Sequence, residues 1–371
     1  MRKLNLLYSL AFLTAAFAVG CKKSNTINNS QVIATPYSLY FTDTAGALYN
    51  STDGKTWNVV FSPDGVPTRS LFNMNGNILM VKNGVYVSKN NGVNFNVSYD
   101  AINTATFPSV NVRGRSFDLN QSMSIYAPED AWRNHAYICS REPSGSNYFG
   151  IYWNETDGTY GSWKPEDYYD SVQVNAGHVN FIRITSFTKL ENGTIVAYDG
   201  NHQMGLYREN INMRWKEMYD NTGSSPMSGI PASPAVFSAG HIHNRLILID
   251  NYGASGAVYS DDLGLNWHAY AGLPTNVPLI SVAAPFEQTC LVGTDSAGLY
   301  KLNINTDAFE KVAGGLPENL VVRSIAFKEN IYKNDAKRQY IFLATNRGIY
   351  KSEDMGINWV LSVPGNFVSV Y

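Results

Sequence analysis

The chain has 371 residues, of which 28 are Lys or Arg and 30 are Asp or Glu, so its formal net charge is −2 at pH 7. A nearly neutral, slightly acidic chain argues against a nucleic-acid partner, because phosphates call for a basic face. The chain is longer than one ordinary globular domain, but repeat folds build single units of this length.

The N-terminus carries a predicted export signal. Arg2 and Lys3 give it a positive start, and the apolar run that follows, residues 4–19, is too short to span a bilayer comfortably. Small residues stand directly before Cys21, an order that resembles the lipobox of bacterial lipoproteins, in which the cysteine is lipidated and the preceding peptide is removed. We therefore expect residues 1–20 to be a lipoprotein signal peptide and Cys21 to be the lipid-bearing residue.

A polar segment begins at the predicted lipidation site. Residues 21–34 are rich in Asn and Ser, with too little apolar content to pack, so we expect them to form a flexible tether. Residue 22 is Lys and not the aspartate that, by resemblance to the usual sorting rule, retains a lipoprotein at the inner membrane. The predicted location is the outer membrane, with its periplasmic and cell-surface sides both open. Residues 35–371 then form a single predicted domain.

One short pattern recurs seven times along this domain. It consists of a glycine, one or two apolar residues and a tyrosine, and successive copies start 38 to 66 residues apart, a spacing that suits propeller blades with inserted loops. The copies start at Gly46, Gly84, Gly150, Gly205, Gly256, Gly298 and Gly348.

The clearest copies continue into a turn of the form Ser-x-Asp-x-Gly-x-Asn-Trp. Residues 260–267 and 352–359 match it fully, whereas residues 88–95 carry Asn for Asp and Phe for Trp, and residues 51–57 are one residue shorter. These turns resemble the Asp-box, or BNR repeat, of the sialidase-like and xyloglucanase-like propellers. The remaining three copies, around Asp157, Asn210 and Asn305, are eroded.

The polar residues of these turns have a structural explanation. An Asp or Asn side chain can accept hydrogen bonds from backbone amides two or three residues further on, and Gly adopts the positive φ that a tight turn needs. The resemblance also implies that the aspartates are not catalytic. We therefore expect Asp53, Asn90, Asp262 and Asp354 to be structural.

The repeat predicts an all-β fold, a seven-bladed β-propeller of four-stranded blades, since each unit offers four short strand-like runs separated by turns. The first unit begins at residues 37–41, which correspond to the second strand of the other units. Residues 366–371 form an unpaired strand pattern at the end of the chain. We expect this tail to pair into the first blade and close the ring, because an open ring would expose sheet edges.

Ligands of a propeller gather where the inner strands begin, at the mouth of the central channel. Arginines stand at this position in four units, and a ring of guanidinium groups would suit a carboxylate or sulfate. The ring resembles the arginine cluster with which sialidases hold a sugar carboxylate; the alternative is that these arginines only pair with acidic residues of neighbouring blades. The arginines are Arg69, Arg115, Arg183 and Arg323.

Aspartates recur after the second strand of four units, at Asp43, Asp199, Asp250 and Asp295. A glycosidase needs two carboxylates facing a bond across a cleft, and the resemblance to xyloglucanase-like propellers makes Asp199 and Asp250 the alternative catalytic pair. Turn formation explains the same residues without chemistry.

An aromatic insert and a histidine pair complete the candidates. Trp132, Trp153 and Trp163 lie in an insert, residues 113–169, that could stack against sugar rings or pack between blades. His241 and His243 flank one residue of a predicted strand and would point to the same side, but no third metal ligand is evident.

No nucleophile elbow, phosphate loop or zinc-protease motif is present, and the sequence indicates no cofactor and no metal. The favoured function is a noncatalytic, monomeric envelope lipoprotein that binds a glycan or an envelope protein. The alternative is a glycoside hydrolase, sialidase-like or xyloglucanase-like, acting at the central mouth. A third possibility is an assembly factor that resembles the photosystem-assembly propellers and presents a broad polar face.

Overall fold

The computed structural model describes a chain made of strands and turns, and none of the described residues lies in a helix. No described helix is therefore available that could cross a bilayer. For β9 to β12 only the backbone is described. The described residues are 32–34, 39–51, 56–68, 70–74, 77–82, 85–90, 92–99, 124–126, 136–141, 149–154, 164–165, 184–199, 204–210, 213, 215–219, 223, 237–253, 256–286, 289–332 and 337–371.

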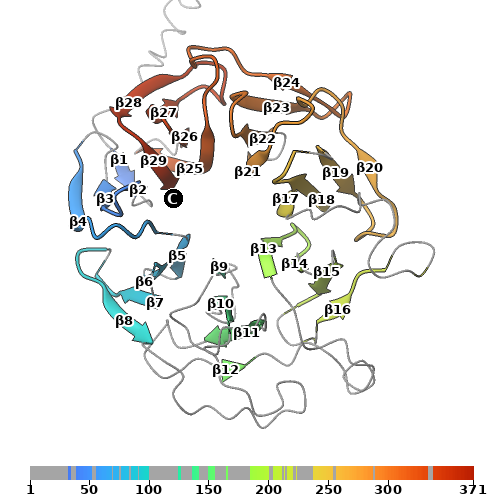
Figure 1. The fold of residues 1–371 in the computed structure, drawn as a ribbon, viewed down its shortest axis with the longest axis horizontal. Helices are drawn as coiled ribbons and strands as arrows, with labels where there is room; N and C mark the ends of the chain where they lie inside the picture. Colours follow the sequence, from blue (N-terminus) through green and yellow to red (C-terminus); the bar gives the residue numbers. More distant parts are fainter. Residues whose placement is uncertain are drawn as a thin grey trace, which may run out of the picture.

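The described strands form seven antiparallel sheets, which surround a common centre as the blades of a β-propeller (Figure 1). Each blade is named here from its innermost strand outward. Blade 1 is β29 (Phe367–Val370), β2 (Leu39–Asp43), β3 (Leu48–Ser51) and β4 (Asn58–Phe61). Blade 2 is β5 (Ser70–Met74), β6 (Asn77–Val81), β7 (Val85–Ser88) and β8 (Asn96–Tyr99). Blade 3 is β9 (Ser124–Tyr126), β10 (Ala136–Arg141), β11 (Phe149–Asn154) and β12 (Lys164–Pro165).

The second half of the ring follows the same order. Blade 4 is β13 (Ile184–Lys189), β14 (Ile195–Asp199), β15 (Met204–Arg208) and β16 (Lys216–Glu217). Blade 5 is β17 (Phe237–Ile242), β18 (Arg245–Asp250), β19 (Ala257–Ser260) and β20 (His268–Ala269). Blade 6 is β21 (Leu279–Phe286), β22 (Thr289–Thr294), β23 (Leu299–Asn303) and β24 (Ala308–Lys311). Blade 7 is β25 (Val322–Tyr332), β26 (Lys337–Thr345), β27 (Gly348–Ser352) and β28 (Val360–Pro364), with β1 (Val32–Ala34) as a fifth strand.

The second strand of a blade has neighbouring blades on both sides. All six residues of β22 are buried, as are five of the six residues of β18. A strand that is covered on both faces requires such an almost continuous apolar run. The hydrophobic clusters accordingly join adjacent blades. One cluster packs Ile247 of blade 5 against Val292 of blade 6, and another packs Leu291 of blade 6 against Leu343 of blade 7. The core is therefore a ring of inter-blade interfaces.

The C-terminal strand closes the ring, as predicted. β29 pairs antiparallel with β2, with Phe41 opposite Val370. Beyond the strand, Tyr40 and Tyr371 exchange backbone hydrogen bonds of 3.1 and 2.9 Å. Figure 1 shows the C-terminus near the centre of the ring, between β2 and β25.

Blade 7 departs from the expected four strands. Val32–Ala34, the last three residues of the predicted tether, form β1 and pair with Ile331 and Tyr332 at the end of β25. The inner strand of this blade has 11 residues, and β1 pairs with the last two of them, on the edge opposite β26. The other six described sheets have four strands each, and the blade number of the whole chain stays a prediction.

The antiparallel order gives the ring two distinct faces. We call entry face the side on which inner strands begin and second strands end, as at Val322 and its partner Thr345. We call box face the opposite side, which carries the turns between third and fourth strands. The turns at residues 88–95, 260–267 and 352–359 are called box turns.

Hydroxyl groups connect neighbouring inner strands. Ser281 of β21 donates to the carbonyl of Val322 in β25 over 2.8 Å, and Ser324 of β25 donates to the carbonyl of Val370 in β29 over 2.9 Å. In both inner strands the serine follows an extra residue, Ile280 or Arg323, at which the strand register shifts. These bulges twist the strand start and redirect its side chains at the channel mouth.

Candidate functional site

The first residue of the turn after the second strand differs from blade to blade. It is aspartate in blades 1, 5 and 6, lysine in blade 2 and asparagine in blade 7. These turns lie on the entry face, where the sequence places the candidate ligand site. The residues are Asp43, Lys82, Asp250, Asp295 and Asn346.

Asp43 organises its own turn. Its Oδ1 accepts hydrogen bonds from the backbone amides of Ala45 and Ala47 at 2.9 and 3.0 Å, and its Oδ2 accepts from the Tyr49 hydroxyl at 3.1 Å. Burial, together with the nearby Asp43 carboxylate, raises the pKa of Tyr49 above its usual range. Both carboxylate oxygens are thus committed to the turn.

Asp250, half of the alternative catalytic pair, is 1% exposed. Its Oδ1 accepts from the Tyr252 amide at 2.8 Å, and its own amide donates to the Gly256 carbonyl, so it too holds a turn. Asp199 ends β14, but its side chain lies outside the described part. Asp295 contributes its amide, which donates to the Pro278 carbonyl at 3.0 Å.

Lys82 is a buried cation that the sequence analysis did not identify. Its Nζ lies 2.8 Å from the Gly46 carbonyl and 2.8 Å from Asp64 Oδ1, both in blade 1, and 4.5 Å from the centre of the Phe61 ring. Burial acts to raise the pKa of Asp64, but the hydrogen bonds from Lys82 and from the Val66 amide outweigh it and lower that pKa. The sequence did offer a signal for Lys82, because a lysine follows a buried apolar run at the position where other units have Asp.

Arg323 is the only described member of the predicted arginine ring. It is the bulge residue of β25, and its Nη1 donates to Asn366 Oδ1 and to the Phe367 carbonyl, both at 2.7 Å. Its partners thus belong to the closing segment rather than to an acidic residue of a neighbouring blade. Arg69, Arg115 and Arg183 lie outside the described residues, so the ring stays a prediction. Arg347, which the sequence analysis missed, is exposed in the entry-face turn of the same blade.

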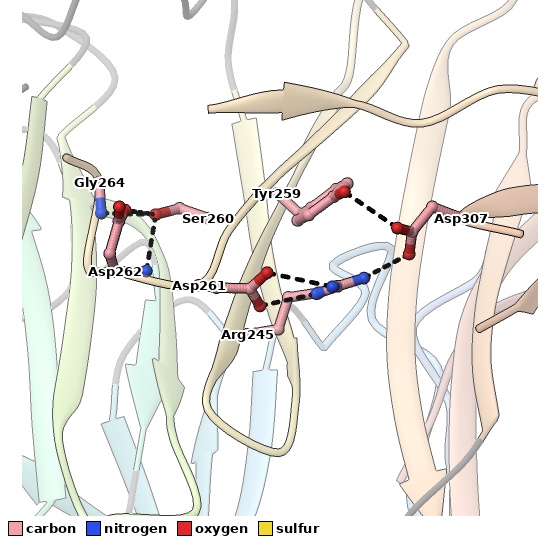
Figure 2. A network of polar contacts seen from close by, with 7 residues as sticks. All are labelled: Arg245, Tyr259, Ser260, Asp261, Asp262, Gly264 and Asp307. Carbon is pink, nitrogen blue, oxygen red and sulfur yellow. Dashed lines mark hydrogen bonds and ion pairs between the residues drawn. The ribbon is translucent and has the colours of Figure 1, made fainter. Parts of the chain in front are cut away.

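The box turns share one hydrogen-bond pattern. In blade 5, the Ser260 hydroxyl accepts from the Gly264 amide at 2.7 Å and donates to Asp262 Oδ1 at 2.8 Å (Figure 2). The same carboxylate accepts from the Asn266 amide at 2.9 Å and from Asn266 Nδ2 at 2.7 Å.

The other two box turns repeat this pattern. In blade 7, Asp354 Oδ1 accepts from the Asn358 amide at 2.9 Å, and its Oδ2 accepts from Asn358 Nδ2. In blade 2, Asn90 Oδ1 accepts from the Asn94 amide at 3.0 Å, so an amide oxygen replaces the carboxylate. Asp53 lies outside the described residues.

The box turns also differ from expectation in one detail. The accepting side chain reaches an amide four residues on, because two successive residues have positive φ. In blade 5 these are Leu263 at 55° and Gly264 at 90°, and in blade 7 Met355 at 62° and Gly356 at 81°. A left-handed non-glycine residue is strained, so the side-chain bonds across the turn compensate for a local cost.

A guanidinium group joins blades 5 and 6 on the box face (Figure 2). Arg245 donates to both oxygens of Asp261 at 2.8 and 3.0 Å, and its Nη1 donates to Asp307 of the next blade. Its guanidinium lies 4.0 Å from the centre of the Tyr259 ring, whose hydroxyl also donates to Asp307. Burial alone would lower the pKa of Arg245, but its hydrogen bonds with Asp261 and Asp307 contribute to a net rise.

The histidine pair is not arranged as predicted. His241 lies in β17 and shares a 2.8 Å hydrogen bond with the Thr188 hydroxyl, and burial lowers its pKa. His243 lies in the following turn with a φ of 51°, beside Glu191 Oε2 at 2.9 Å. The strand ends between them, so the alternation that would align the two rings is lost; among the described residues no group of metal-ligating side chains forms.

The tryptophans of the predicted aromatic insert have no described side chains. Trp132 and Trp163 lie outside the described residues, as does the side chain of Trp153, which pairs through its backbone with Tyr137 of β10. The lipidation residue Cys21 is also outside them. These predictions stay open.

Comparison with known proteins supports the architecture. The profile of the DUF6242 beta propeller domain matches residues 22–207. YCF48 from Cyanidioschyzon merolae is similar in fold, with a TM-score of 0.53 and 11% identity over 84% of this chain and 90% of that chain. A structure of YCF48 bound to D1 peptide gives a TM-score of 0.48 at 14% identity, over the same shares of the two chains. The GH74 enzyme of Niastella koreensis gives 0.40 at 12% identity, over 89% of this chain and 61% of that one. No curated protein matches the sequence.

Proposed function

The chain belongs to the family of DUF6242 beta propeller domains, and on that premise we propose that it is a noncatalytic binding module of the cell envelope. Its ligand is a glycan or an envelope protein, and it binds at the entry face. We further infer that the box turns are Asp-box repeats of the sialidase-like and xyloglucanase-like type, with a purely structural role.

The state of two entry-face aspartates, Asp43 and Asp250, carries the proposal. A glycosidase needs one carboxyl group to donate a proton and another to act on the opposite side of the bond, so both must reach the substrate. Asp250 is buried and bonded to its own turn, and Asp43 gives both oxygens to backbone amides and to Tyr49. These contacts support a structural role for both carboxylates.

Other entry-face side chains are suited to binding. Tyr252 is 61% exposed, and Arg347 is exposed two blades away. Tyrosine offers a large flat surface with a polar tip, and arginine can hold a carboxylate with two parallel hydrogen bonds. A carboxylate-bearing glycan or an acidic protein segment fits this combination.

The proposed location rests on the N-terminal sequence. An apolar run that ends in small residues before Cys21 favours lipidation of that cysteine, and Lys22 favours the outer membrane. Mass spectrometry of the mature N-terminus tests this, with Cys21→Ser as the control that should lose both the lipid and the membrane association.

Assays of binding and of glycoside hydrolysis distinguish a noncatalytic binding module from a glycoside hydrolase. The full chain is applied to arrays of envelope glycans and of acidic and neutral peptides, and in parallel to chromogenic glycosides. We expect the chain to bind a ligand on the arrays and to release no chromophore from the glycosides. Arg347→Ala or Tyr252→Ala should weaken the binding affinity about tenfold, which corresponds to a loss of about 1.4 kcal/mol. Ile357→Ser, on the opposite face, is the matched control and should bind normally. Release of chromophore that Asp199→Asn or Asp250→Asn abolishes would overturn the proposal in favour of a glycoside hydrolase.

A further inference from the structure

The exposed apolar side chains of the described residues are concentrated on one face. Ten large hydrophobic side chains are exposed, and the two tyrosines among them, Tyr219 and Tyr252, lie away from the turns between third and fourth strands. The other eight lie in those turns or in the first residues of the outer strands that follow. They are Val59, Val93, Met213, Leu265, Ile304, Ile357, Val360 and Leu361.

The box turns show the pattern most clearly. The residue between the glycine and the following asparagine is Val93 in blade 2, Leu265 in blade 5 and Ile357 in blade 7. Val93 and Ile357 are 63% and 62% exposed, and the hydrogen bonds of the turns use the backbone at this position and not the side chain, as in the 3.3 Å bond from the Val93 amide to the Asn90 carbonyl. The turn does not need an apolar side chain at this position, so its repeated use calls for a partner outside the chain.

Blade 7 carries three of these eight exposed side chains. Val360 and Leu361, the first residues of β28, are 70% and 45% exposed and follow directly after the box turn that carries Ile357. Three exposed apolar side chains within five residues are more than the single, scattered ones that an ordinary protein surface carries.

The N-terminal strand reaches the same face of the same blade. β1 pairs with Ile331 and Tyr332, the last residues of β25, and β25 runs from the entry face to the box face. Ten residues separate Val32 from Cys21. Even fully extended, this connection spans at most about 40 Å. A lipid on Cys21 would therefore tether the propeller at the box-face end of blade 7 and keep that end within about 40 Å of the membrane surface.

We propose that the box face is a membrane-contact surface, whose aliphatic turn tips enter the interfacial region of the lipid bilayer and orient the propeller with its entry face outward. This rests on the proposed lipidation of Cys21. Single aliphatic side chains enter the interface weakly, but several on one face act together with a lipid chain, the two-signal arrangement that stable membrane attachment needs.

Depth-sensitive fluorescence tests the orientation. The full chain is reconstituted in vesicles of phosphatidylethanolamine and phosphatidylglycerol and labelled at Leu265→Cys, Ile357→Cys or, as the entry-face control, Tyr252→Cys. The unsubstituted chain, labelled in parallel, corrects for native thiols. We expect nitroxide-bearing lipids to quench the probes at positions 265 and 357 and to leave the probe at position 252 unquenched. A probe at Val93→Cys should lose much of its quenching when Leu265 and Ile357 are replaced by serine.

The outcomes distinguish this inference from the proposed anchoring. If mass spectrometry finds no lipid on Cys21, the anchoring and the orientation both fail. If the lipid is present but the box-face probes are not quenched, or all three probes are quenched alike, only the orientation is overturned. Disulfide cross-linking between two copies at position 357, in place of lipid quenching, would overturn it in favour of a second copy of the chain.

Discussion

The entry face and the box face are built by the same strands, yet their turns differ in kind. On the box face, Asn90, Asp262 and Asp354 make the same backbone hydrogen bond in three separate blades. On the entry face, the corresponding turns begin with Asp, Lys or Asn. Asp43 and Asp250 both accept from the amide two residues on, whereas Lys82 donates to the Gly46 carbonyl of blade 1 and Asn346 accepts from the Val321 amide. A repeated turn answers a demand common to all blades, namely reversal of the chain, whereas a varied turn is free to acquire local contacts. The binding that we propose for the entry face depends on this freedom of its turns.

The closing strand should matter more than any turn on either face. Deleting residues 366–371 removes the buried side chains of Phe367 and Val370, each worth about 1.5 to 3 kcal/mol, and exposes the edge of β2. We expect loss of cooperative thermal unfolding and of soluble protein, measured by circular dichroism and sedimentation. Val368→Ala, which keeps the strand, is the control. A truncated chain that melts like the full one would show that closure is dispensable.

Lys82 tests whether the entry face contributes to stability as well as to recognition. Lys82→Ala leaves a cavity and an unpaired Gly46 carbonyl, and we expect a loss of about 2 to 4 kcal/mol in denaturant unfolding. Lys82→Met should lose less, since it fills the space, and Asp64 is 37% exposed and can be solvated without its partner. Equal losses in the two variants would assign the effect to charge alone.

Arg245 tests the connection between blades on the box face. Arg245→Ala breaks its hydrogen bonds with Asp261 and Asp307, and we expect a loss of about 1.5 to 3 kcal/mol. Arg245→Lys keeps the charge but cannot bond Asp261 with two parallel donors, so most of the loss should remain. Lys216→Ala, which removes an exposed ion pair with Glu209, is the control and should leave the free energy of unfolding nearly unchanged, because water screens an exposed pair. Full rescue by lysine would contradict the geometric explanation.

The chain contains its own control for the box turn. Asn90 makes the backbone bond that Asp354 makes, so Asp354→Asn should be tolerated better than Asp354→Ala, which we expect to lose about 1 to 2 kcal/mol. Hydrogen bonds from the Asn358 amide and side chain lower the pKa of Asp354 below its ordinary 3.8. The stability linked to this group is therefore complete above pH 3.8 and lost as the pH falls through the lower folded value. Acid unfolding should be less steep in Asp354→Asn; an unchanged pH profile would contradict this linkage.

The smallest effect on stability belongs to the box-turn tips. Leu265→Ser and Ile357→Ser change exposed side chains with no described role in the fold, so the free energy of unfolding should stay within about 0.5 kcal/mol of the wild type. A larger loss in chemical denaturation would show that the tips serve folding, and it would remove the contrast between the two faces.

The repeat made much of the fold predictable. The box turns, the propeller architecture and the pairing of the C-terminal strand with β2 all follow from local patterns at fixed spacing. The contacts between blades do not. Nothing near Lys82 in the sequence indicates that Gly46 accepts its hydrogen bond, and nothing near Arg323 indicates that Asn366 does, because these partners meet only once the ring has formed. The pairing of β1 with β25 was missed for the same reason, since a three-residue strand in a polar segment leaves no periodic signal.

The pairing of β29 with β2 also has a consequence for biogenesis. A chain is synthesised from its N-terminus, so the partner of β2 arrives last. Until then, the first blade has an unsatisfied backbone edge, which can pair with the strand of another chain. A chain that is terminated early or nicked before β29 can never complete the circle, so its open edge favours aggregation.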